Sequence, residues 1–191
     1  MHAKLKRTMD AAEIVSRWME QPLGKREFEA SRDAGMSPTA AEILPALKHP
    51  NSRIRFDCLG MLDHLADESS LEPMISAARD PMPRVRRMAV HALGCQRCKP
   101  SALCSDLNAV FLPIAETDSA WRVRREAVIS IVQQPASDRS RASLAHLARY
   151  DPHPKVRKQA GWAFRIQTGQ GWSYGHHDRP RPEAKGRRSR T

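Results

Sequence analysis

The feature that most constrains this sequence is an internal repeat that aligns without gaps. Four stretches share the pattern, and they begin at His49, Asp80, Asp118 and Asp151. Each contains a branched apolar residue directly before an arginine, and these apolar residues are Ile54, Val85, Val123 and Val156. Their spacings of 31, 38 and 33 residues are typical of a solenoid, in which every unit buries its apolar face against the next one.

The apolar residues within each unit recur at helical spacing. Val85, Ala89, Ala92 and Leu93 fall on one face of a helix, and a second amphipathic run precedes each shared stretch, as in TAAEILPALKH over 39–49. Asp-Pro pairs at the junctions indicate turns. Ser69 and Glu72 have the spacing of a capping box. The sequence therefore predicts helical hairpins.

Composition supports this all-α interpretation. Apolar residues make up 40% of the chain and aromatic residues only 5%, a balance that fits packed helices better than a β-sandwich. No apolar run approaches the ~20 residues that a membrane-spanning helix needs. The N-terminus lacks the apolar stretch of a signal peptide. We therefore expect a cytoplasmic protein with reduced thiols.

The pattern Asp-x4-Val-Arg-x2-Ala-x3-Leu over residues 37–167 resembles the short HEAT repeats of the phycobilisome-lyase type. The resemblance implies a right-handed α-solenoid of about four HEAT-like hairpins. It also implies a structural ladder between successive repeats, formed by Asp80, Arg86, Asp118, Arg124, Asp151 and Arg157. The first unit has His49 where the others have aspartate, which predicts an incomplete first rung.

The segments outside the repeats differ from them in composition. Residues 1–36 contain one amphipathic run and are expected to form a helical cap on the first repeat, because terminal repeats are usually atypical. Residues 168–191 are rich in Gly, Pro and Arg without apolar periodicity, which predicts a disordered basic tail. The longest interval between repeats contains an insertion at about 95–104.

The chain is strongly basic, with a formal net charge of +11. Alignment of the repeats stacks cations in columns on either side of the ladder arginines. These columns are Arg84, Arg122 and Lys155, and then Arg87, Arg125 and Lys158. They predict an anion-binding strip near the helix N-termini, and a solvated basic face is the alternative. Trp121 replaces a proline of the other repeats and is expected to pack on the preceding hairpin.

The insertion carries three of the four cysteines. His91 and Cys95 are four residues apart on one helix face, and Cys98 and Cys104 follow, which makes these four residues candidate ligands of one structural zinc ion. His64 occupies the Cys95 position of the preceding repeat and is a rival fourth ligand. Free thiols are an equal alternative, and redox or disulfide chemistry is a third. Cys58 aligns with Ala89 and is expected in the core.

The motifs that would identify an enzyme are missing from this sequence, which has neither a phosphate-binding glycine loop nor a G-x-S-x-G elbow. The first hypothesis is a non-enzymatic scaffold whose basic concave face holds an acidic protein or peptide. The alternative is a nucleic-acid-binding protein that contacts phosphates through the strip and the tail. A third hypothesis is a bilin-lyase subunit or a HEAT-like DNA glycosylase using Trp121 and Asp118.

Overall fold

The structure is a computed structural model, and it describes residues 10–20, 37–96, 98–99 and 106–170. Within these ranges the chain is helical and contains no strand. In chain order the elements are α1 (Ala11–Met19), α3 (Ala40–Ile43), η1 (Leu44–Lys48), α4 (Ser52–Leu65), η2 (Glu68–Ser70), α5 (Leu71–Ala77), α6 (Pro83–Gly94), α7 (Asn108–Thr117), α8 (Trp121–Ile131), α9 (Asp138–Tyr150) and α10 (Pro154–Gln167). None of the described helices is long and apolar enough to span a membrane.

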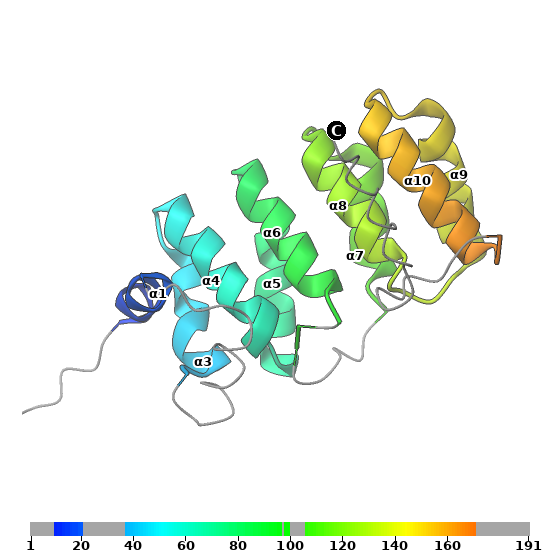
Figure 1. Cartoon of the computed structure of the whole chain (residues 1–191). Helices are drawn as coiled ribbons and strands as arrows, with labels where there is room; N and C mark the ends of the chain where they lie inside the picture. The colour runs from blue at the N-terminus through cyan, green and yellow to red at the C-terminus, as the bar shows by residue number, and fades with distance from the viewer. Residues whose placement is uncertain (1–9, 21–36, 97, 100–105, 171–191) are drawn as a thin grey trace, which may run out of the picture.

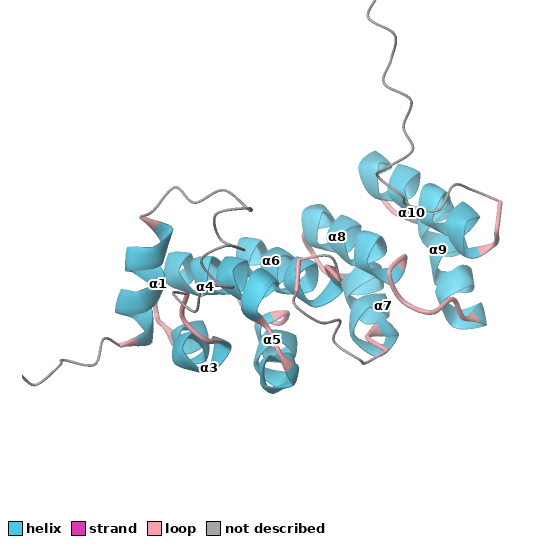
Figure 2. Ribbon diagram, turned by 60° about the horizontal axis from the view of Figure 1, so that its bottom comes forward, coloured by secondary structure: helices cyan, strands magenta, loops and turns pink. Residues whose placement is uncertain are grey.

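The helices form two rows, as an α-solenoid requires. The B row contains the second helix of each hairpin, α4, α6, α8 and α10, which stand side by side in Figure 1. The A row contains the first helices, α3 with η1, α5, α7 and α9, and the turned view in Figure 2 separates the two rows. Within the B row each helix packs on the next one, so equivalent residues of successive repeats become neighbours.

The core lies between the rows and follows the repeat. Val85, Val123 and Val156 are fully buried, and so are the alanines one turn later, Ala89, Ala127 and Ala160. Cys58 occupies the alanine position of the first repeat and is also fully buried, as expected. Small side chains in this column let adjacent B-row helices approach closely while the larger aliphatic residues fill the space between the rows.

One close contact in the B row involves a glycine. Gly94 ends α6 and packs against Ser130 of α8, whose hydroxyl donates a hydrogen bond to the Val90 carbonyl at 3.2 Å. A Cβ atom added to Gly94 would lie 2.3 Å from Ser130 Oγ and 2.6 Å from its Cβ. Gly94 is therefore required for its lack of a side chain and allows α6 and α8 to pack at this spacing.

The capping prediction at Ser69 and Glu72 is wrong. Asp67 caps this segment instead, and its carboxylate accepts hydrogen bonds from the Ser69 amide at 3.0 Å and the Ser69 hydroxyl at 2.6 Å. A carboxylate is a stronger acceptor than a hydroxyl, so the chain turns two residues earlier, and the 3-10 helix η2 precedes α5.

The ends of the stack are only partly described. At the N-terminal end α1 packs against α3, η1 and α4, and its buried residue Val15 belongs to the common core. The rest of the predicted cap, 1–9 and 21–36, and the predicted tail from residue 171 onward lie outside the described residues. In the insertion the structure describes 95, 96, 98 and 99.

Candidate functional site

The predicted ladder residues form one repeated contact between hairpins. Arg86 donates from Nε and Nη2 to the two carboxylate oxygens of Asp118 in the next repeat, at 2.7 and 2.9 Å. Its Nη1 donates to the Asp80 carbonyl of its own repeat at 2.9 Å. Arg124 repeats this arrangement with Asp151 at 2.8 and 3.0 Å. Each guanidinium thus bridges two hairpins through a bidentate ion pair.

The first rung of the ladder is complete, which corrects the expectation from His49. Arg55 donates to Asp80 at 2.6 and 3.0 Å, so the carboxylate comes from the following repeat, and His49 supplies only its backbone carbonyl, at 2.7 Å. Arg157 donates to the Asp151 carbonyl at 2.8 Å, and among the described residues it has no carboxylate partner. The open position is therefore at the C-terminal end of the stack.

The ladder makes stability sensitive to acid. Burial raises the pKa of Asp80, but hydrogen bonds from Arg55 and from the Met82 amide outweigh it, so the net shift is downward, and Asp151 behaves in the same way beside Arg124. The resulting stabilisation is fully present above the unfolded-state aspartate pKa of about 3.9, and it is lost as the pH falls through the lower folded-state pKa.

The free energy of unfolding can be measured with urea and circular dichroism. We expect the contribution of the ladder aspartates to it to stay constant between pH 7 and pH 5. It should fall steeply below about pH 4. An Asp80→Asn variant should be less stable at neutral pH, and its free energy of unfolding should fall less as the pH is lowered. An acid profile identical in slope to that of the unmodified chain would contradict this origin.

All six predicted strip residues line two adjoining hollows on one face of the B row. Arg84, Arg87 and Arg122 line a hollow of ≈ 420 Å³ between α6 and α8. Arg125, Lys155 and Lys158 line a hollow of ≈ 600 Å³ between α8 and α10. Trp121 lines both hollows, so they form one basic groove, which is the name we use for this surface.

Trp121 separates the two hollows. Its ring stacks on His153 of the following hairpin, with ring centroids 3.9 Å apart and planes 5° from parallel. The stacking partner comes from the following hairpin, and Trp121 also lines the hollow beside Pro83 and Arg84 of the preceding hairpin, on which the sequence predicted it to pack. The Arg122 guanidinium lies 4.5 Å and the Lys155 ammonium 5.4 Å from its ring centroid. Cation–π contacts of this kind hold both charges beside the groove.

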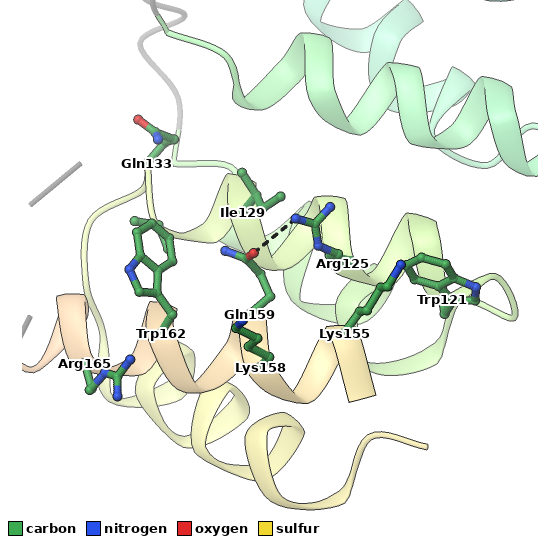
Figure 3. Close-up of a pocket in the computed structure, with 10 residues that line it drawn as sticks. Trp121, Arg125, Ile129, Gln133, Lys155, Lys158, Gln159, Trp162 and Arg165 are labelled. Carbon is green, nitrogen blue, oxygen red and sulfur yellow. Dashed lines mark hydrogen bonds between the residues drawn. The ribbon is translucent and has the colours of Figure 1, made fainter. Parts of the chain in front are cut away.

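The larger hollow has an apolar end that the sequence did not assign. Figure 3 shows Trp162 and Trp121 at opposite ends, with Arg125, Lys155 and Gln159 between them. Ile129 and Val132 add apolar surface, and Arg165 adds a further cation. Helical spacing carries a signal for two of these residues, because Trp162 and Arg165 follow Lys158 by four and seven residues.

Comparisons with known proteins agree with this geometry. Residues 40–105 match the family model described as HEAT repeats. Residues 40–105 of this chain therefore form HEAT repeats. The chain is also similar to a solved structure entitled a crystal structure of an engineered protein, with a TM-score of 0.59 and 18% sequence identity, covering 85% of this chain and 72% of that one. At that identity the similarity concerns the fold alone. No curated protein matches the sequence.

A second cluster lies where the first two B-row helices of the HEAT array end. His64 lies in the last turn of α4 and His91 in the last turn of α6, and Cys95 caps α6, with Cys98 following. The structure brings these four predicted metal ligands together around Asp63, which the sequence analysis did not select. The fifth predicted ligand, Cys104, lies outside the described residues.

Charged residues surround these donors. His91 Nδ1 lies 3.0 Å from Glu126 Oε1 and its Nε2 lies 3.6 Å from Asp63 Oδ2, and the two carboxylates raise the pKa of His91 to about 10. Burial, with smaller contributions from Cys95 and Asp63, raises the pKa of the Cys98 thiol to about 12.

Proposed function

We propose that this HEAT-repeat protein is a non-enzymatic scaffold that holds an acidic segment of a partner protein in the basic groove. The observation that supports it is the convergence of six cations from three helices on adjoining hollows that share Trp121. Repeat solenoids present extended surfaces of this kind to their partners. A partner that supplies carboxylates along the groove would meet one cation-lined hollow after another.

The groove cations differ from the ladder arginines in how their charge is balanced. Each of Arg55, Arg86 and Arg124 faces an aspartate that neutralises it. By contrast, none of the six groove cations forms an ion pair with another described residue. Several unpaired cations close together create a positive electrostatic potential, so the groove attracts anions. The ladder arginines are neutralised by their aspartates and contribute to stability instead.

The lining favours an acidic peptide over a nucleic acid. Single-stranded nucleic acids bind by stacking bases on exposed aromatic rings, but the ring of Trp121 already stacks on His153 and carries cations beside it. The apolar end at Trp162 and Ile129 instead suits a bulky apolar side chain next to the carboxylates. We therefore infer a partner segment in which acidic residues alternate with large apolar residues.

A binding experiment with a defined probe tests the proposal. The probe is a fluorescein-labelled peptide of glutamates interspersed with leucines, and its affinity is measured by fluorescence anisotropy at physiological salt. We expect the double variant Arg125→Glu, Lys158→Glu to bind roughly 100-fold more weakly, because two charge-assisted contacts of about 1.5 kcal/mol each are lost.

The matched control is the double variant Arg79→Glu, Arg149→Glu, which changes the net charge equally but places the exposed charges in the turn after α5 and at the end of α9. This control should bind the peptide within about threefold of the unmodified chain if the groove is specific, since distant surface charges act only through screened electrostatics. Equal loss in both variants would reject the groove. Tighter binding of a random DNA duplex than of the peptide would instead favour a nucleic-acid partner.

A further inference from the structure

The cluster at the ends of α4 and α6 brings together donor atoms that the repeat does not require. Asp63, His91 and Cys95 place one donor atom each within 4.8 Å of one another, and Asp63, His64 and Cys98 do the same. Asp63 belongs to both groups and its side chain is only 7% exposed. Two thiols, imidazoles and a buried carboxylate together form a donor set that suits a transition metal ion.

The two oxygens of the buried Asp63 carboxylate have different neighbours. Asp63 Oδ2 lies 3.6 Å from His91 Nε2 and 3.9 Å from His64 Nε2. Asp63 Oδ1 has no hydrogen-bond partner among the described residues, and the fully buried Lys99 ammonium approaches it at 3.8 Å. Lys99 also donates to the Ala92 and Cys95 carbonyls, which hold it there. Oδ2 is therefore the oxygen beside the histidines, and Lys99 balances the charge at Oδ1.

Glu126 orients the imidazole of His91. Because Glu126 Oε1 accepts from His91 Nδ1 at 3.0 Å, the other ring nitrogen, Nε2, points toward Asp63. A carboxylate behind a metal-binding histidine fixes the tautomer and the direction of the ring in many metal sites. Glu126 therefore holds His91 with Nε2 directed at the Asp63 carboxylate. Glu126 comes from α8, so this contact connects a third B-row helix to the site.

We propose that Asp63, His91, Cys95 and Cys98 bind one zinc ion that fastens the end of α6 to α4. On binding, Zn²⁺ displaces the proton on His91 Nε2 and the protons of both thiols, which pass to solvent. Tetrahedral zinc with bonds of about 2.0–2.3 Å places its ligand atoms about 3.3–3.8 Å apart. The 3.6 Å between His91 Nε2 and Asp63 Oδ2 already fits this range, and Cys95 Sγ lies within 4.8 Å of a ligand atom of each. Cys98 Sγ lies within 4.8 Å of Asp63 in the second group, so it must turn toward His91 and Cys95 to complete the set. Four protein ligands leave no open position, so the ion is structural.

The test uses the full chain, reduced and stripped of metal with a chelator. Native mass spectrometry after addition of equimolar Zn²⁺ should show one zinc per chain, and the midpoint of thermal unfolding should rise because the metal binds the folded state. Mg²⁺ should have neither effect, because thiolates and imidazoles are poor ligands for it. Cys95→Ser and Asp63→Asn should each lose the bound zinc while keeping the helical circular dichroism spectrum.

The control variant is Cys58→Ala, which removes a fully buried thiol outside the cluster and should retain zinc. A chain that binds no zinc would overturn the proposal, and so would an Asp63→Asn variant that binds it as tightly as the unmodified chain. Retention of zinc in His91→Ala together with its loss in His64→Ala would overturn the assignment of His91. This experiment is independent of the basic groove, which lies on other residues.

Discussion

Replacement of Arg124 by alanine is expected to lower the free energy of unfolding by about 3–5 kcal/mol, as happens when one partner of a buried ion pair is removed. Arg124 and Asp151 form the most buried rung of the ladder, with side chains only 9% and 2% exposed. The variant would leave the Asp151 carboxylate buried without its guanidinium and would remove the contact of Arg124 with the Asp118 carbonyl at 2.9 Å. Both losses fall on the same joint between hairpins.

The measurement is urea unfolding followed by circular dichroism, with the slope checked for two-state behaviour. Arg141→Ala is the matched control, because Arg141 pairs with Asp138 at the surface of α9. Exposed pairs contribute little to stability, so the control should unfold at almost the same urea concentration as the unmodified chain. Equal midpoints for the two arginine variants would contradict a stabilising role of the ladder.

Gly94→Ala is expected to lower the free energy of unfolding by about 1–3 kcal/mol, the second largest effect. The reason is that overpacking a close helix contact forces side chains and backbone apart. The added methyl would overlap Ser130 in both its Oγ and Cβ atoms, and Ser130 Cα lies only 3.2 Å away, so rotation of the serine does not relieve the clash. Separation of α6 from α8 would also stretch the rung between Arg86 and Asp118.

The control for this prediction is Gly60→Ala, in the interior of α4, where an added Cβ meets nothing within 4 Å. Alanine is the better helix former, so Gly60→Ala should stabilise the chain by roughly 0.5–1 kcal/mol. If the lack of space at Gly94 causes the loss, thermal and urea unfolding should show Gly94→Ala to be less stable and Gly60→Ala to be more stable than the unmodified chain. Adding Ser130→Gly to Gly94→Ala should recover part of the loss, and a purely additive double variant would argue against the clash.

Most of the fold could be predicted from the sequence, because the same pattern of apolar and charged residues occurs in four repeats. The buried valine column and the ladder arginines recur at fixed positions, so a single alignment was enough to find them. The sequence did not predict which aspartate pairs with each ladder arginine. The aspartate six residues before Arg86 lies in the same hairpin, yet the carboxylate that pairs with Arg86 belongs to the next one. Sequence separation alone does not distinguish these two arrangements.

The two candidate sites differ in how much could be predicted. The groove cations repeat with the helices, so their columns were visible, whereas the apolar end at Trp162 occurs once and had no counterpart in the alignment. In the cluster, Asp63 corresponds to Gly94 of the next repeat and Glu126 lies on a third helix. Residues that meet only through stacking, and only once, have no periodic signal that alignment could detect.

The two ends of the ladder bear on whether molecules of this chain can polymerise. At the last hairpin Arg157 keeps the backbone contacts of an internal rung and has no described carboxylate partner. A second molecule docked end to end in the same register would bring His49 to this place, and an imidazole cannot supply the bidentate acceptor that a guanidinium needs. End-to-end stacking of two molecules by repetition of the internal joint would therefore lack the bidentate ion pair that each internal joint has.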